Sequence, residues 1–175
     1  MKSLKNNLSN IRKPLLVIAA STALITGGLN SDLIRDVALH EGYRSSAYIP
    51  VPGDVPTIGY GSTKHPDGTP VKLGEYLTRG TAESYLVHDV NKFTKAIAKC
   101  IKVPVTEGEF KAFVSFSYNV GSSAFCKSTL VKKLNAYDYD AACAELNKWV
   151  YFKGRILPGL VNRRNKEYST CMEGK

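Results

Sequence analysis

The sequence lacks the spacing patterns that mark metal, haem and nucleotide sites. Its four cysteines include no CxxC pair, its three histidines are scattered, and no glycine-rich nucleotide loop or haem motif is present. We therefore expect no cofactor and no bound metal. Internal repeats and low-complexity linkers are missing too, so the 175 residues are expected to form one domain, in one or two lobes.

Acidic residues are scarce, with 15 Asp and Glu against 24 Lys and Arg and a formal net charge of +9. A basic chain favours polyanionic partners, which include nucleic acid, anionic lipid and a bacterial envelope. The charge alone does not choose among these partners, and a general solvating role is an alternative. Residues 1–13 contain no acid and four basic residues, Lys2, Lys5, Arg12 and Lys13.

A long apolar run is also missing. Residues 15–29 (LLVIAASTALITGGL) carry no charge, but a helix of this length spans roughly 22 Å, short of the ~30 Å hydrocarbon core of a bilayer. The basic flank predicts a cytoplasmic N-terminus and an exported body. The segment is interpreted as a cleavable signal peptide, with a cut near Ser21-Thr22-Ala23, or as an uncleaved, weakly held anchor; a buried core helix is the alternative.

The cysteines fit export, because an even number in an oxidising compartment favours two disulfides. Three connectivities are open, and four reduced, buried side chains are the alternative. The residues concerned are Cys100, Cys126, Cys143 and Cys171.

Periodicity predicts an α+β fold. Residues 31–41 predict a helix that Asn30 or Ser31 caps and Gly42 stops. Residues 48–61 predict a hairpin with a type II turn at Pro52-Gly53. One short sheet followed by helices indicates a small lobe, a larger helical lobe and a cleft between them. The later helices are expected over 81–99, from a capping box at 106–109 to Gly121, and near 128–135, 141–150 and 160–171.

Glu41 is a candidate catalytic residue because of its place on the first helix. It ends that helix, where the macrodipole disfavours an anion, and it shares a face with Ile34 and Val37. Both conditions favour a protonated carboxyl group, which a general acid needs. The alternative is a structural Glu paired with a nearby Arg or Lys.

The predicted hairpin supplies groups that could face this acid. Thr57, Gly59 and Gly61 alternate onto one strand face, so a polymer could lie close to the backbone there. Asp54 follows the turn, three residues before Thr57. Glycosidic hydrolysis requires an acid that faces a second carboxylate across a cleft, and a nearby hydroxyl fits such a site. The alternative is that Asp54 is an ordinary turn residue.

Several motifs, in this order and spacing, resemble the phage lysozyme family, glycoside hydrolase family 24. The resemblance runs from about residue 33 to the end of the chain. It implies a lysozyme-like fold and a muramidase that cuts the β-1,4 bond between N-acetylmuramic acid and N-acetylglucosamine, with Glu41 as general acid and Thr57 in the site. The motifs are Glu41-Gly42-Tyr43-Arg44, Ala47-Tyr48, residues 57–61 (TIGYG), residues 116–121 (FSYNVG), Ser128-Thr129-Leu130, Trp149 and residues 159–164 (GLVNRR).

The chain departs from the family pattern at the second carboxylate. The family has an Asp, or sometimes a Cys, at the position that Pro50 occupies here, and Thr57 comes one residue later than in that pattern. Asp54 is the only acid between Glu41 and Thr57. We infer that a one-residue insertion remodels the hairpin and that Asp54 supplies the carboxylate.

The N-terminal segment resembles the signal-arrest-release anchors of some phage endolysins, which are tethered inactive in the membrane and then released. Because residues 1–30 contain no cysteine, activation by exchange with an anchor thiol is excluded. The resemblance implies a basic cytoplasmic leader (1–13), a signal-anchor (14–30) and a lysozyme domain (31–175), composed of a small lobe (31–80), a connecting helix (81–99) and a helical lobe (100–175).

The same resemblance implies partners and cross-links. The partners are peptidoglycan and, before release, the inner membrane, with no nucleic acid; the chain is expected to be a monomer that moves from the inner membrane to the periplasm and lyses the host cell. The implied disulfides are Cys100–Cys126 and Cys143–Cys171.

Two other functions remain as alternatives. A lytic transglycosylase would act on the same bond with one Glu and no water-directing carboxylate, and a non-catalytic cell-wall-binding protein would use the basic surface. The Arg163-Arg164 pair is interpreted either as a contact to the anionic wall or as structural ion pairs on a helix.

Overall fold

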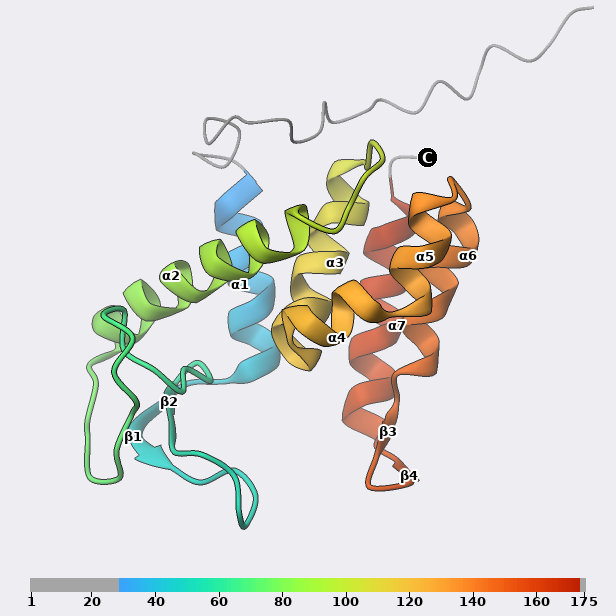
Figure 1. Ribbon diagram of the computed structural model, residues 1–175. Helices are drawn as coiled ribbons and strands as arrows, with labels where there is room; N and C mark the ends of the chain where they lie inside the picture. Colours follow the sequence, from blue (N-terminus) through green and yellow to red (C-terminus); the bar gives the residue numbers. More distant parts are fainter. Residues whose placement is uncertain (1–28, 174–175) are drawn as a thin grey trace, which may run out of the picture.

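The described part of the chain is a helical body with two small β-hairpins at one end (Figure 1). The computed structural model describes residues 29–173, so the leader and nearly all of the predicted signal-anchor lie outside the described residues. Over residues 29–173, no helix has the length and apolar character needed to cross a bilayer. In chain order the elements are α1 (Leu29–Glu41), β1 (Arg44–Tyr48), β2 (Thr57–Gly59), α2 (Arg79–Ala98), α3 (Glu107–Val120), α4 (Ser122–Lys127), α5 (Thr129–Asn135), α6 (Tyr139–Glu145), the 3-10 helix η1 (Leu146–Lys148), β3 (Tyr151–Phe152), β4 (Arg155–Ile156) and α7 (Pro158–Met172).

The predicted α+β class is confirmed, with one correction to the sheet. The sequence predicted one short sheet, whereas the described residues form two antiparallel pairs, β1–β2 and β3–β4. The second pair was missed because strands of two residues are too short to produce an alternating pattern. The predicted helices correspond to α1, α2, α3, α5, α6 and α7, and α4 is additional.

Helix α1 carries Glu41 at its last position. It begins at Leu29, so the prediction that Asn30 or Ser31 caps it is wrong, since both lie within the helix. The predicted stop at Gly42 is confirmed: this glycine has φ +68°, and its N–H donates to the carbonyl of Ala38 at 3.0 Å. The division into lobes stays a prediction, and α1 packs against both α2 and α3.

The first hairpin begins earlier than the predicted range of 48–61. Arg44 pairs with Gly59 and Tyr48 pairs with Thr57, so the chain segment before the prolines forms the first strand. The three prolines between the strands have no N–H to donate to a ladder, and the connection therefore leaves the sheet.

The tip of this hairpin is the predicted turn. Gly53 has φ +87°, and the N–H of Asp54 donates to the carbonyl of Val51 at 2.9 Å. Proline followed by a glycine of positive φ is the pattern of a type II turn, so the prediction at Pro52-Gly53 is confirmed.

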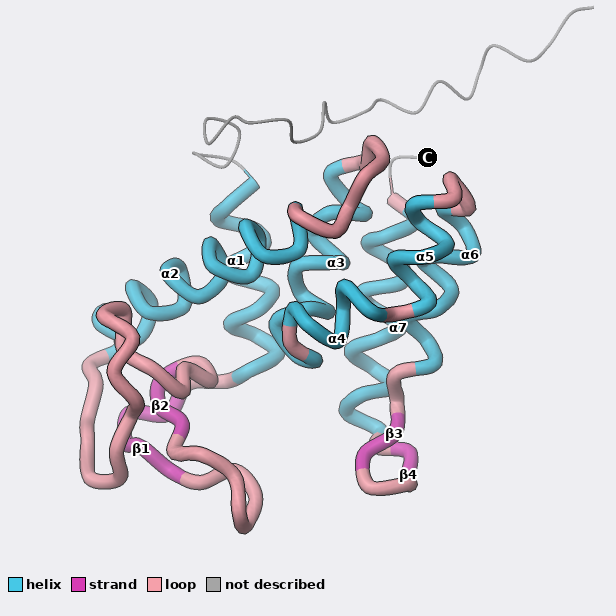
Figure 2. The backbone as a smooth tube through the Cα atoms, viewed as in Figure 1, coloured by secondary structure: helices cyan, strands magenta, loops and turns pink. Residues whose placement is uncertain are grey.

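Helix α3 is the centre of the core. Its predicted capping box is confirmed: the Thr106 hydroxyl accepts from the Glu109 N–H, and the Glu109 carboxylate accepts from the Thr106 N–H at 2.8 Å. The helix packs against α1, α2, α4 and α7, and Figure 2 shows it between α1 and α7. Its buried side chains include Phe110, Phe113, Val114, Phe116 and Ser117.

Two disulfides cross-link the helical part. Cys100–Cys126 joins the loop after α2 to α4, and Cys143–Cys171 joins α6 to α7. These are the pairs that the family resemblance implies, and no cysteine is free.

Candidate active site

The two carboxylate oxygens of Glu41 have different surroundings. Oε1 accepts a hydrogen bond from Nη1 of Arg163 at 2.7 Å. A β-carbon placed on Gly61 would lie 3.5 Å from Oε2, so the missing side chain at Gly61 leaves this oxygen open. The Glu41 side chain is 21% exposed, which keeps it in reach of a ligand. One oxygen is therefore fixed and the other is available for chemistry.

Arg163 holds Glu41 from a buried position on α7. Its Nε pairs with Glu167 Oε1 at 3.1 Å, and its Nη2 donates to the carbonyl of Ser115 at 3.1 Å. Arg163 is only 6% exposed, and its guanidinium joins α1, α3 and α7. A planar fork of donors is suited to this task, because each partner fixes the direction of the others.

Arg164 and Glu167 complete a chain of alternating charges behind Arg163. Arg164 is fully buried, pairs with Glu167 Oε2 at 3.2 Å and donates to Asn119 at 2.6 Å. Burial lowers the pKa of Arg164 to about 10. Burial also raises the pKa of Glu167, and the two arginines act against that rise.

This network decides two of the sequence interpretations. Because Arg163 and Arg164 are buried, the hypothesis that they contact the cell wall is wrong, and the interpretation as structural ion pairs on a helix is confirmed. Glu41 does have the Arg partner that its alternative required. The same guanidinium also pairs with Glu167, so Arg163 is shared between two carboxylates.

The two glycines near β2 face different neighbours. Gly61 borders Glu41, whereas a β-carbon on Gly59 would lie 3.1 Å from Cβ of Ala82 on α2. The expectation that both glycines leave room for a polymer is therefore wrong for Gly59, where the missing side chain lets α2 pack closely. Tyr118 supports the same region by donating its hydroxyl to the Tyr60 carbonyl at 3.0 Å, and burial raises the pKa of that hydroxyl above its usual range.

Thr57 and Asp54 lie on the first hairpin, and neither bonds to Glu41. The Thr57 hydroxyl is buried and donates to the Val55 carbonyl at 3.1 Å. Asp54 is exposed at the turn, where its Oδ1 accepts from the Val55 N–H at 2.9 Å. Both side chains thus bond within the connection between β1 and β2, and their catalytic roles stay predictions.

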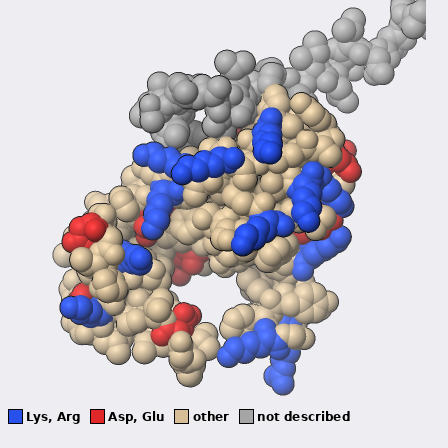
Figure 3. Space-filling model, viewed as in Figure 1, with Lys and Arg blue, Asp and Glu red and all other residues tan. Residues whose placement is uncertain are grey.

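An opening separates the two hairpins (Figure 3). One wall is the region of β1 and β2, the other is the region of β3 and β4, and the end of α1 lies between them in Figure 1. Acidic atoms are visible on the first wall and basic atoms on the second. The opening corresponds to the cleft that the sequence predicted between two lobes.

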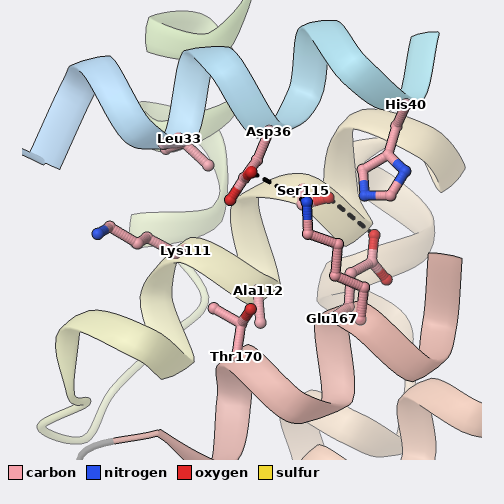
Figure 4. Close-up of a pocket in the computed structure, with 9 residues that line it drawn as sticks. Leu33, Asp36, His40, Lys111, Ala112, Ser115, Glu167 and Thr170 are labelled. Carbon is pink, nitrogen blue, oxygen red and sulfur yellow. Dashed lines mark hydrogen bonds and ion pairs between the residues drawn. The ribbon is translucent and has the colours of Figure 1, made fainter.

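A small cavity lies between α1, α3 and α7 (Figure 4). Its volume of about 20 Å³ accommodates a single water molecule and excludes a sugar. His40 and Asp36 extend toward it from α1, and Ser115 donates to Glu167 at 2.8 Å beside it. This cavity is therefore too small to be the substrate site, and the opening is the candidate binding site.

The sequence predicted helix ion pairs for Arg163 and Arg164 as one interpretation, but it did not identify Glu167 and Glu41 as their partners. The sequence does contain a signal for the ion pairs within α7. Glu167 follows Arg163 by four residues and Arg164 by three, which places the three side chains on one helix face. The pairing with Glu41, 122 residues away, had no local signal. Among residues 29–173, no group of three His, Cys, Asp or Glu side chains is arranged to hold a metal ion.

The part of the chain that is similar to known proteins includes the residues of this site. A family model described as phage lysozyme matches residues 38–167, which include Glu41, Thr57 and Arg163. The SAR-endolysin of Bacteriophage PS119 is 35% identical over 158 residues, covering 90% of this chain and 88% of that protein. The endolysin of Bacillus phage B103 is 39% identical over 136 residues, and the match spans 50% of that longer protein. The solved endolysin from Escherichia coli O157:H7 phage FAHEc1 is 36% identical, with a TM-score of 0.73, covering 86% of this chain and 96% of that one.

Proposed function

The chain belongs to the phage lysozyme family, and on that premise we propose that it is a lytic enzyme that degrades peptidoglycan with Glu41 as its general acid. The specific reaction proposed is muramidase hydrolysis of the β-1,4 bond between N-acetylmuramic acid and N-acetylglucosamine. The observation that carries this proposal is the unequal environment of the two Glu41 oxygens.

Glu41 would act through Oε2. Arg163 occupies Oε1, so a proton on Oε2 points toward the space that Gly61 leaves empty. A glycosidic oxygen in that space would receive this proton as the bond to the sugar carbon breaks. The buried ion pairs of Arg163 keep the carboxyl group in one orientation while the substrate binds.

Water would attack the sugar carbon with help from the first hairpin. Thr57 and Asp54 are the proposed positioning group and second carboxylate. The hydroxyl of Thr57 and the carboxylate of Asp54 both bond to Val55, so a change in this connection would move them together. The alternative, a lytic transglycosylase, needs neither group, because the sugar's own hydroxyl replaces water.

The proposed partners and location follow from the N-terminal sequence and the relatives. We propose that residues 14–30 enter the inner membrane behind the basic leader and that the domain 31–175 acts in the periplasm, as a monomer without a cofactor, to lyse the host. The relatives named SAR-endolysin and the two disulfides are consistent with export. A non-catalytic wall-binding protein is the competing proposal from another class.

The test compares Glu41→Gln with the wild type on purified peptidoglycan, measured as release of soluble fragments. We expect a loss of at least roughly 100-fold, because removal of a general acid costs about this factor. Glu83→Gln, an exposed carboxylate on α2, is the matched control and should keep full activity. Full activity of Glu41→Gln would contradict the proposal, and inactive wild type would favour the wall-binding alternative.

Two further variants test the proposed roles of Thr57 and Asp54 separately. Thr57→Ala and Asp54→Ala should each reduce the rate if they direct water. If Asp54→Ala keeps most of the activity while Glu41→Gln loses it, the role proposed for Asp54 is wrong.

A further inference from the structure

The β3–β4 hairpin presents an exposed apolar surface that no described element covers. Tyr151 is 62% and Ile156 54% exposed, and Phe152 and Leu157 are exposed beside them. The hairpin is well formed, since its strands pair and the Leu157 N–H donates to the Val150 carbonyl at 3.0 Å. Grouped apolar side chains that stay in water on an ordered element indicate an interaction surface.

The turn of this hairpin places a lysine where lysine is unfavourable. Lys153 has φ +49° and Gly154 has φ +76°, the two positive values of a type I′ turn. Such turns favour Asn, Asp or Gly at the first position, whereas a long side chain there is uncommon. A residue held at positive φ on an exposed turn suggests that its side chain is retained for a contact.

The hairpin is also strongly basic. Residues 146–166 contain six basic residues and no acid. Lys153 and Arg155 form no ion pair with any described residue, and Lys153 lies 5.5 Å from the ring centre of Phe152. Two free cations beside apolar side chains match a ligand that carries carboxylates and small alkyl groups.

The position of the hairpin indicates which ligand this is. It forms the wall of the opening across from the β1–β2 region, and α7, which follows it directly, carries Arg163. We propose that the β3–β4 hairpin is a second substrate-binding element that holds the anionic stem peptide of peptidoglycan; the inference rests on the proposed function. A glycan strand in the opening has its peptides attached at the muramic acid residues, beside the bond that Glu41 would cut. The peptide's carboxylates meet Lys153 and Arg155, and its alkyl groups meet Phe152 and Ile156.

The experiment uses the full chain and two forms of one polymer: intact sacculi, and the same sacculi stripped of peptide by an amidase. The variant is Lys153→Gly with Arg155→Gln, since glycine keeps the type I′ turn without strain. Lys92→Gln with Lys95→Gln, two exposed lysines on α2, is the control with the same change in charge. Binding by co-sedimentation and the KM and kcat of fragment release are measured on both polymers, at low and high salt.

We expect the hairpin variant to bind intact sacculi roughly tenfold more weakly, with a higher KM and an unchanged kcat, as for two exposed charge contacts. Stripped sacculi should bind both proteins equally, and added salt should remove the difference on intact sacculi. The control should match the wild type throughout.

An equal loss on both polymers, or no loss on either, overturns the proposal. A third contrary result is unchanged binding to intact sacculi together with lost binding to vesicles of anionic phospholipid, which would make the hairpin a membrane contact. Because co-sedimentation requires no catalysis, the hairpin is tested even if the wild type cleaves nothing, and that result would refute the proposed function alone.

Discussion

At the scale of single residues, the site depends on how one guanidinium is shared. Arg163 bonds to Glu41, to Glu167 and to the Ser115 carbonyl, so its position is fixed by three elements. A lysine has the same charge but no rigid fork, and its one nitrogen cannot reach three partners in three directions. In the proposed mechanism Arg163 is therefore a positioning residue, which would act on the chemistry through Glu41.

Arg163→Lys should lower kcat by roughly tenfold to 100-fold and leave KM for peptidoglycan nearly unchanged, since misplacement of a catalytic group has effects of this size. Steady-state kinetics on purified peptidoglycan measure both constants. Arg35→Lys, an exposed arginine on α1 paired with Asp32, is the control and should leave both constants unchanged. A kcat equal to that of the wild type would show that the contact is structural only.

His40, on α1, should make the stability of the protein depend on pH. Burial, with added repulsion from Arg163 and Lys166, lowers the pKa of His40 from 6.5 to about 4, and nearby Asp36 opposes this. The folded protein thus keeps this imidazole neutral over a range in which the unfolded chain protonates it. Its contribution to stability is complete above pH 6.5 and is lost as the pH falls toward about 4.

We expect the wild type to lose at most about 1.4 kcal/mol of unfolding free energy per pH unit in this window through His40. Partial solvent access at the site reduces the value. His40→Gln should flatten the dependence, as measured by urea unfolding at pH 7 and pH 4.5. Identical slopes for the variant and the wild type would contradict this explanation.

At the scale of elements, the two disulfides should differ in their effect on the site. Each closes a loop, with sequence separations of 26 and 28, and such loops stabilise by about 3–4 kcal/mol. Cys143–Cys171 is buried and anchors α7, the helix of Arg163, whereas Cys100–Cys126 joins the loop after α2 to α4 and has no end on that helix. Loss of the first should therefore affect catalysis as well as stability.

The double variants Cys143→Ala/Cys171→Ala and Cys100→Ala/Cys126→Ala test this difference. Both should lose about 3–4 kcal/mol in urea unfolding, and only the first should also lose kcat at a temperature at which both are folded. Equal kcat values in the two variants would show that the α6–α7 cross-link does not hold the site.

The sequence predicted the elements whose signals are local. The capping box at Thr106 and Glu109, the stop at Gly42 and the turn at Pro52-Gly53 depend on neighbouring residues, and each is found. The β3–β4 hairpin was missed because two-residue strands have no periodicity. The contact of Gly59 with Ala82 depends on where α2 packs, which spacing along one strand does not encode.

The candidate site was predictable only in part for the same reason. Glu41 was predicted from its place at the end of a helix and from the motif that follows it, and its catalytic role stays a prediction. Arg163 was noticed but not connected to Glu41, because their contact joins residues far apart in the chain. Asp54 and Thr57 were placed on the correct hairpin, and their roles depend on a substrate that brings water to them.

At the scale of the whole molecule, the opening and the basic charge fit the proposed activity. In the proposed function, the formal net charge of +9 would attract the molecule to an anionic wall. A strand bound in the opening between the hairpins would contact Glu41 and the basic hairpin from different sides. Hydrolysis and transglycosylation would use the same opening and the same acid. They differ in what attacks the sugar carbon, so the products distinguish them.

Mass spectrometry of the fragments released from purified peptidoglycan in ¹⁸O-labelled water is the most direct test of the central claim. The account predicts reducing N-acetylmuramic acid ends that carry one ¹⁸O atom from the wild type, and no such ends from Glu41→Gln. Unlabelled 1,6-anhydro ends would contradict hydrolysis, and labelled ends produced at the wild-type rate by Glu41→Gln would contradict the role of Glu41.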